Sequence, residues 1–352
     1  MLLFLARRIR YSLLVLWGVV TLVFFLFNVL PADPARLIMG NRTDHATYDN
    51  IRHEMNLDKP MWERYLVYIN DLLPISINSK DNVEKQKYHY LQLLPVSSVK
   101  CVVLKWPYLG RSYRTKREVT NVLGDTLPGT AILALSAMVF ATFFGILLGV
   151  LAALKKGTWI DTSAIAASVA GISMPSFFAG LIIVYVFGYL LHNYTGLNMT
   201  GSLWEYEPFT GKHLVLKNLI LPAFALGIRP LAIITQLTRS SLLDVLSQDY
   251  IRTGYAKGLS KMKVIFRHAL PNALNPVITA ISGWLAELLA GSFFIEYIVG
   301  WKGVGRVTVD ALDKFDFPLV MGSVLLTASI FIIVSLLTDM LYGWLDPRIR
   351  LQ

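Results

Sequence analysis

The chain has 352 residues, of which 55% are hydrophobic and only 16% are charged. Soluble domains carry about a quarter charged residues, and disordered chains contain less Leu, Ile, Val and Phe, so both classes are excluded. The formal net charge of +10 indicates basic cytoplasmic loops of a membrane protein rather than nucleic-acid binding. Cys101 is the only cysteine, which excludes an internal disulfide and a multi-cysteine metal site.

The first apolar segment, Tyr11–Leu30, has no charged residue and is about 30 Å long as a helix, which matches a bilayer core. An Arg-rich stretch, residues 1–10, precedes it. No small-x-small cleavage site follows, so we expect an uncleaved anchor. Five more apolar segments complete a prediction of six membrane-spanning helices: Leu127–Leu154, Thr162–Leu191, Asn218–Leu243, Ala273–Ile295 and Phe317–Leu341. The third span is long enough to bend around Gly171 and Pro175.

The distribution of basic residues predicts the orientation. With both termini on one side of the membrane, 13 Lys and Arg lie in the short segments on that side and 5 in those opposite. The excess places residues 1–10 and 346–352 in the cytoplasm. Residues 31–126 are too long to obey this rule, and we expect them to form a small external subdomain with a polar loop at Asn78–Lys87. The five remaining spans form a helical core over residues 127–345.

Motifs for catalysis and nucleotide binding are missing from the sequence. It contains no G-x-x-x-x-G-K-[ST], so any energy from ATP is expected to come from partner subunits. His53–Leu57 begins like a zinc-protease motif and Gly171–Pro175 like a nucleophile elbow, but each lacks the last residue of its motif. The six histidines show no metal-ligand spacing. We therefore predict no catalytic residue, no metal site and no bound cofactor.

The loop Asp244–Pro271 between the fourth and fifth spans is the most informative segment. Gly258 suits a left-handed residue that closes a helix through Ala256, and Ser260 can cap a second short helix that stops near Pro271. The apolar residues are too few to cross a membrane and too many for a free loop. The loop carries a basic flank of Lys257, Lys261, Lys263 and Arg267. Two interpretations stay open on these residues alone, a helix lying against anionic lipid and a docking site for a protein.

This loop resembles the cytoplasmic signature of permease subunits of ATP-binding-cassette importers. The resemblance is carried by Gly258, followed after nine residues by His268-Ala269-Leu270-Pro271. That signature has Glu-Ala-Ala before the glycine, whereas this chain has Arg252-Thr253-Gly254, which is closer to the dipeptide, oligopeptide and nickel permease branch. Four other segments resemble the B-type subunits of the same branch: FLARRIRYSLLVLWGVVTLVFFLFNVLPADPA, LGRSYRT, EYIVGWKGVGR and LTDMLYGWLDPRIR. Residues 78–105 then stand out as an insertion.

The resemblance implies an all-α membrane protein of the type I importer permease kind in the cell inner membrane. Residues 244–271 would act as a coupling loop that docks into a cytoplasmic ATPase, and the outer segment would receive a substrate-loaded binding protein. The implied partners are a second homologous permease, two ATP-binding subunits, an external binding protein and membrane lipid. The implied cargo is a short peptide. A nickel or other small-solute importer and, from another class, a membrane-embedded hydrolase are the alternatives.

Two further sets of residues are candidate sites. Arg229 and Glu287 lie at similar depth within the fourth and fifth spans, where each isolated charge costs about 2.5 to 3.5 kcal/mol, so neither is expected to face lipid. They either line a polar route for the two ends of a peptide or form a fixed ion pair. Outside the fifth span, Glu296, Gly303, Gly305 and Arg306 either form an external gate or belong to a plain turn.

Overall fold

The computed structural model describes residues 2–29, 36, 45–54, 57–80, 88, 90–97, 99–207, 209, 211–290 and 292–345. Four helices in this part of the chain are long and apolar enough to cross a membrane. They are α1 (Leu2–Val29), α6 (Val119–Leu154), α10 (Lys217–Leu246) and α17 (Phe317–Leu345). Each overlaps one of the predicted spans, because uninterrupted apolar runs satisfy their backbone hydrogen bonds best as helices.

The other two predicted spans are broken helices. The first broken span consists of α7 (Trp159–Ser173) and α8 (Ser176–Tyr185), and α8 continues into a π-helical turn, η1 (Val186–Leu190). The angle between α7 and the α8–η1 segment is 110°. The break falls at Pro175, which has no backbone N–H and disfavours helix in the residue before it, so the predicted bend is present and is sharp. In the second pair, residues Lys261–Ala273 meet α14 (Asn275–Ala290) at 51°. The count reaches six spans when each bent pair crosses once.

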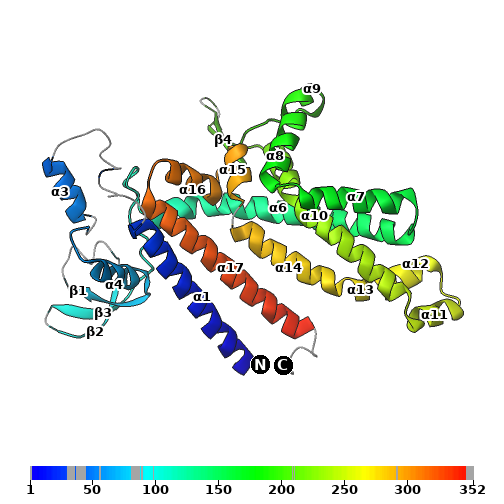
Figure 1. Ribbon diagram of the computed structural model, residues 1–352, viewed down its shortest axis with the longest axis horizontal. Helices are drawn as coiled ribbons and strands as arrows, with labels where there is room; N and C mark the ends of the chain where they lie inside the picture. Colours follow the sequence, from blue (N-terminus) through cyan, green and yellow to red (C-terminus); the bar gives the residue numbers. More distant parts are fainter. Residues whose placement is uncertain are drawn as a thin grey trace. The chain divides into compact units, whose positions relative to one another are not determined.

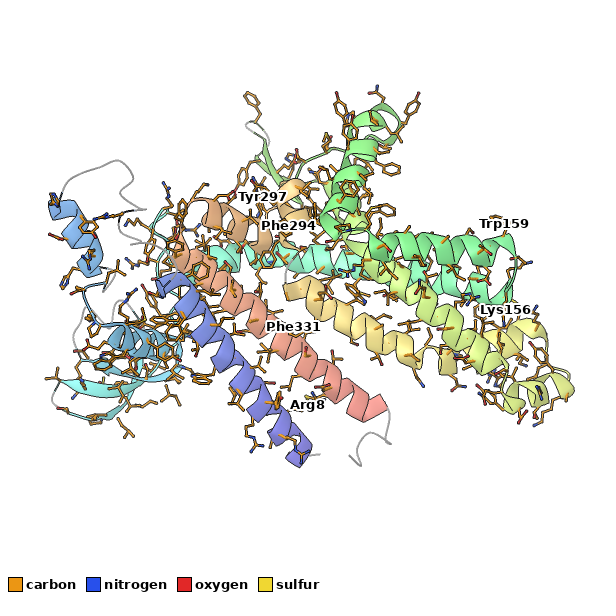
Figure 2. The ribbon with its side chains drawn as sticks, viewed as in Figure 1. Arg8, Lys156, Trp159, Phe294, Tyr297 and Phe331 are labelled. Atoms are coloured by element: carbon orange, nitrogen blue, oxygen red, sulfur yellow. The ribbon has the colours of Figure 1, made fainter. Side chains whose placement is uncertain are left out.

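The fifth span differs from its predicted bounds. Instead of one helix over Ala273–Ile295, α14 ends at Ala290 and a separate short helix, α15 (Phe293–Ile298), follows. Gly291 and Ser292 stand between them, and both residue types are poor helix formers. Phe294 and Tyr297 project from α15 and are exposed (Figure 2).

The chain forms two compact units. The first comprises Met1–Arg8, Thr126–Val307 and Ser329–Gln352, and α10 is its central helix, packed against α7, α8 and α14. Figure 1 shows α11 (Asp249–Ala256) and α12 (Lys261–Val264) at one end of α10 and α15 near the other. The remaining elements here are α9 (His192–Thr195), the hairpin β4 (Trp204–Glu207) and β5 (Gly211–Leu214), and the start of α16 (Val304–Asp313).

Small residues allow α6 to approach α10 closely. A Cβ atom on Gly145 would lie 2.8 Å from Ile234 Cγ2, and one on Gly149 would lie 2.5 Å from Thr238 Cβ. Helices in membranes associate through such small residues because burial from lipid gives little driving force and close van der Waals contact must replace it. The backbones of α6 and α10 are therefore closely packed within the first unit.

An ion pair holds the turn between α6 and α7 against α10. Arg239 of α10 donates from Nε and from Nη2 to the two carboxylate oxygens of Asp161, the second hydrogen bond being 2.7 Å long. Asp161 Oδ2 also accepts the backbone N–H of Gly157 at 3.0 Å. Lys156 and Trp159 mark this turn in Figure 2. The Asp161 side chain is only 5% exposed, so the pair links the turn to α10.

The second unit comprises Ile9–Asp125 and Thr308–Ala328. It contains α3 (His45–Glu54) and α4 (Met61–Leu72), followed by an antiparallel sheet of β1 (Ile75–Ser79), β3 (Lys100–Leu104) and β2 (Leu91–Pro95) in the order β1-β3-β2. Tyr65 of α4 packs edge-on against Phe24 of α1, with ring centroids 5.2 Å apart, and its hydroxyl lies 2.7 Å from Thr21 Oγ1. α4 is thus fixed to the end of α1.

The sheet corrects one expectation, the polar loop at Asn78–Lys87. Short runs that contain β-branched Ile and Val residues favour strands. Asn78 and Ser79 do not belong to a loop; they pair with Cys101 and Lys100 in the ladder between β1 and β3. The predicted loop residues 81–87 lie outside the described residues. The predicted insertion at 78–105 therefore supplies β2 and β3.

A buried carboxylate joins the LGRSYRT segment to the start of α17. Asp316 is 2% exposed and accepts hydrogen bonds from Ser112 Oγ at 2.5 Å and from the backbone N–H of Tyr113 at 3.0 Å. A Cβ atom on Gly322 of α17 would lie 2.5 Å from Val119 Cγ1, so the helix also needs a small residue at that contact.

We expect Asp161→Asn to lower the free energy of unfolding, because the change leaves the Arg239 guanidinium without its charged partner. Arg239→Gln should cost a similar amount. The double variant should lose clearly less than the sum of the two, which thermal unfolding of the detergent-purified protein can measure. Strictly additive losses would contradict the pairing.

Candidate functional site

The loop between α10 and α14 forms an elbow, defined here as residues 249–273. Its first helix, α11, ends in a Schellman motif: the N–H of Gly258 bonds to the carbonyl of Tyr255 at 2.9 Å, and the N–H of Leu259 to that of Gly254 at 3.3 Å. Gly258 has φ +79°, the left-handed conformation predicted for it. A Cβ atom there would meet nothing within 4 Å, so the requirement for glycine is conformational rather than steric.

The second half of the elbow differs from its prediction. Ser260 occupies the N-cap position of α12, but its side chain makes no capping hydrogen bond. The helix passes through an unpredicted π-helical turn, η2 (Ile265–Ala269), into α13 (Leu270–Ala273), and so it stops near Pro271, two residues beyond it. Pro271 lies in the first turn of α13, directly after the π-helical turn. The change of direction comes instead after Ala273.

A small apolar core fixes the elbow to two spans. Ile251 of α11, Val264 of α12 and Ala269 of η2 are at most 1% exposed. They cluster with Val150 and Ala153 at the end of α6, Leu242 of α10 and Ala273 of α13. A displacement of the elbow must therefore move the ends of α6 and α10 with it, since a close-packed core has little room to deform.

The opposite face of the elbow is exposed. Arg252 and Thr253 lie on it, and the Arg252 guanidinium is 3.4 Å from Asp249 Oδ1. Gly254 lies nearer the core, where the Cβ of an alanine would stand 3.6 Å from Val264 Cγ2, an ordinary contact. His268 and Leu270 are half-buried, and Pro271 is exposed. The seven predicted coupling residues thus lie in one structural element, whose exposed face combines apolar and basic side chains.

Arg229 and Glu287 do not form an ion pair. The sequence had left open whether they pair or line a polar route for the peptide. Both side chains are exposed, and in the described part of the chain no acidic group lies within 4 Å of the Arg229 guanidinium. The guanidinium carbon lies instead 5.6 Å from the centre of the Trp284 ring on α14, within cation–π range. The structure therefore leaves the Glu287 carboxylate without that partner.

Glu287 ends a stripe of polar and small residues along α14. Asn275, Thr279, Gly283 and Glu287 are exposed and are spaced four residues apart, so they share one side of the helix. The Thr279 hydroxyl bonds to the Asn275 carbonyl at 3.2 Å. Polar side chains on a lipid-facing surface are costly, so this stripe indicates a surface that meets protein or water in the assembled protein.

The residues of the predicted external gate gather around the buried Glu296 carboxylate. Glu296 is fully buried, and its Oε2 accepts the backbone N–H of Gly305 at 2.7 Å and that of Arg306 at 3.3 Å. These are early N–H groups of α16, which have no partner within the helix, so the carboxylate caps α16. Its Oε1 accepts the Ser292 hydroxyl at 2.8 Å, and Arg306 Nη1 donates to the Gly300 carbonyl at 2.5 Å.

Burial raises the pKa of Glu296, and the hydrogen bonds from Ser292, Thr130 and the two backbone N–H groups partly oppose that rise. Space around the carboxylate is tight. A Cβ atom on Gly303 would lie 2.3 Å from Glu296 Oε2 and 2.6 Å from Thr130 Oγ1. Gly303 is therefore required for close approach, and Glu296, Gly303, Gly305 and Arg306 form one continuous hydrogen-bonded turn.

Several residues of these sites were not predicted from the sequence. Thr130 Oγ1 accepts the N–H of Val304 at 2.8 Å, and the fully buried Trp301 donates from its indole to the Gly129 carbonyl at 2.9 Å. No sequence signal indicated them, because both hydrogen bonds join segments more than 170 positions apart in the chain. Asp161 carried a better signal, since a carboxylate close to an apolar span needs a cation such as Arg239.

Apolar helices with an amphipathic elbow packed on their ends are the organisation of a multi-pass membrane transport subunit. The family described as "Binding-protein-dependent transport system inner membrane component" matches residues 145–351, and its N-terminal counterpart matches residues 1–78. The chain belongs to this family of inner membrane transport components.

The relatives of this chain have consistent names. It is 37% identical to the di/tripeptide transport system permease protein DppB of Pseudomonas aeruginosa, with all of both chains covered. It is 36% identical to the dipeptide transport system permease protein DppB of Escherichia coli K12, with 99% of each covered. It is 33% identical to the dipeptide transport system permease protein DppB of Bacillus subtilis 168, with 95% of this chain and 93% of that chain covered.

A solved structure supports the fold. A chain of the MetNI methionine ABC transporter, in an inward-facing conformation, matches with a TM-score of 0.50 and 15% identity. The match covers 64% of this chain and 96% of that chain. At this identity the likeness concerns the fold, which is that of an ABC importer permease.

We expect Gly258→Val to uncouple ATP hydrolysis from transport, because a β-branched residue is strongly disfavoured at φ +79° and would open the Schellman turn. Gly258→Asn is the matched control, since Asn tolerates the left-handed region and the site has room for it. Uptake and transport-linked ATPase activity in the reconstituted assembly measure both. Equal coupling in the two variants would contradict a conformational role for Gly258.

We expect Gly303→Ala to lower stability by about 2 kcal/mol, because its methyl group would displace the Glu296 carboxylate from buried N–H groups. Gly124→Ala in α6 is the control: nothing lies within 4 Å of its added Cβ, so the helix should gain up to about 1 kcal/mol. The melting temperature of each purified variant measures the difference. A Gly303→Ala protein as stable as the Gly124→Ala protein would refute the crowding argument.

Proposed function

We propose that this chain is the permease subunit of an ATP-driven importer of short peptides. The observation that carries the proposal is the elbow, whose exposed face is free for a partner while its buried face is packed into the ends of α6 and α10. The substrate class is supported by relatives named for dipeptide or di/tripeptide transport at 33–37% identity over nearly the whole chain.

The chain would work with four other subunits. Two cytoplasmic ATP-binding subunits would supply the energy. One of them would bind the elbow at Arg252, Thr253 and Gly258. A second, homologous permease would complete the passage, and an external binding protein would deliver the cargo to residues 31–126. In this scheme the chain binds no cofactor and catalyses no reaction, and ATP is consumed by its partners.

In our proposed topology each bent helix pair crosses the membrane once, giving six spans with both termini in the cytoplasm. The excess of basic residues beside the termini supports this orientation. The turn around Glu296 would then lie near the outer face. We propose that this turn fixes the start of α16 rigidly and does not move as a gate. Four donors bond to the Glu296 carboxylate, and opening the turn would leave this buried group without them.

The polar stripe of α14 is our candidate for one wall of the translocation pathway. Glu287 would meet the peptide amino group, and Arg229, which is not paired with Glu287, would meet its carboxylate. Both charges are exposed, so water or a partner surface must solvate them in the membrane. An importer of nickel or another small solute remains the second candidate, because the polar stripe would also suit a hydrated solute.

The test reconstitutes the chain with its partner subunits and the loaded binding protein in proteoliposomes. ATP-dependent uptake of a labelled dipeptide, without nickel uptake, is the expected result. Glu287→Gln should lower uptake about tenfold, because a charged hydrogen bond contributes about 1.5 kcal/mol, whereas Glu287→Asp should retain most activity. Full uptake by Glu287→Gln would remove Glu287 from the pathway, and nickel uptake without peptide uptake would overturn the substrate.

A further inference from the structure

An apolar groove runs along the first unit between α6 and the α13–α14 segment. Its volume is about 650 Å³. Met138, Phe143 and Leu147 of α6 form one wall, and Phe266, Leu270 and Leu285 contribute to the other. Thr142 is the only polar residue among the twelve that line it. The groove lies between segments that are long and apolar enough to cross a membrane, so its occupant must be apolar.

The inner end of the groove carries positive charge. Val150 and Leu270 line the groove and also belong to the core that anchors the elbow, so the elbow lies at this end. Lys263 and Arg267 flank Phe266 within one helical turn on the elbow, and both are exposed. In the described part of the chain, no carboxylate lies within ion-pair distance of either side chain. An occupant with an apolar body and an anionic end would match both features.

The wall chemistry argues against a protein helix as the occupant. Helices that pair in membranes use small residues, as α6 does at Gly145 and Gly149 where it meets α10. The groove presents Leu, Ile, Val, Met and Phe side chains instead, which keep a second backbone at a distance. α14 offers its polar stripe of Asn275, Thr279, Gly283 and Glu287 for protein or water, and Ile281 and Leu285 lie on another side of the helix.

We infer that this groove is a binding site for an anionic phospholipid, with one acyl chain between α6 and α14 and the headgroup phosphate at Lys263 and Arg267. Basic pockets between membrane helices on the cytoplasmic side bind anionic headgroups in this way. The inference rests on the proposed function only for the cytoplasmic location of the elbow. A bound lipid would fill the space between α6 and the elbow, and would therefore bias how the elbow moves.

The test uses the assembled transporter in nanodiscs made of equal parts phosphatidylglycerol and phosphatidylcholine. Phosphatidylglycerol with a photoreactive acyl chain should label the groove walls on α6 and α14, as mapped by peptide mass spectrometry. Excess phosphatidylglycerol should compete and phosphatidylcholine should not. Lys263→Gln with Arg267→Gln should weaken this preference about thirtyfold, because each basic residue contributes about 1 kcal/mol near an anionic headgroup.

Two controls make the result decisive. Lys257→Gln with Lys261→Gln removes the same charge from the same elbow but not from the turn of Phe266, and should leave labelling unchanged. Leu147→Trp fills the groove from an exposed position and should reduce labelling without removing a charge. Cross-linking of the walls to the partner permease, absence of label, or equal competition by both lipids would overturn the inference. None of these outcomes depends on the transported substrate.

Discussion

The shared core of Ile251, Val264 and Ala269 with Val150 and Leu242 is the contact on which the coupling mechanism that we propose depends. A docking loop that was only tethered to its spans could move without moving them. Here the side chains that make the loop amphipathic are also the side chains that fill the space between the ends of α6 and α10. Because packed interiors transmit displacement, a force applied to the exposed face reaches the spans directly.

The charged groups within and beside the spans divide into two kinds. Asp161 with Arg239, and Glu296 with its four donors, are satisfied inside the chain, and each fixes a turn to a helix. Arg229 and Glu287 are exposed and are not paired with each other. An unpaired charge is costly in hydrocarbon. The first kind therefore stabilises the architecture, and the second kind requires water, cargo or a partner.

α14 also shows how one helix can serve several environments. One side packs against α10, another carries the polar stripe, and a third borders the apolar groove. The preceding segment, which meets α14 at 51°, contributes Phe266 and Leu270 to the groove, so the elbow and the groove share residues. The permease, lipid and ATPase surfaces that we propose can therefore coexist on neighbouring faces.

The amino-acid sequence alone was enough to predict the membrane class, the positions of the four long apolar helices and the left-handed turn at Gly258, because apolar length and glycine conformation are local properties of the chain. It also indicated that Arg229 and Glu287 were unusual. The folded arrangement was needed to show that these two do not pair, that Asp161 meets Arg239 across 78 positions, and that Glu296 organises Gly303, Gly305 and Arg306. It also showed the π-helical turn at Ile265–Ala269, which was not predicted. Such contacts depend on how distant helices cross, and that geometry follows from side-chain packing over the whole unit rather than from any local pattern.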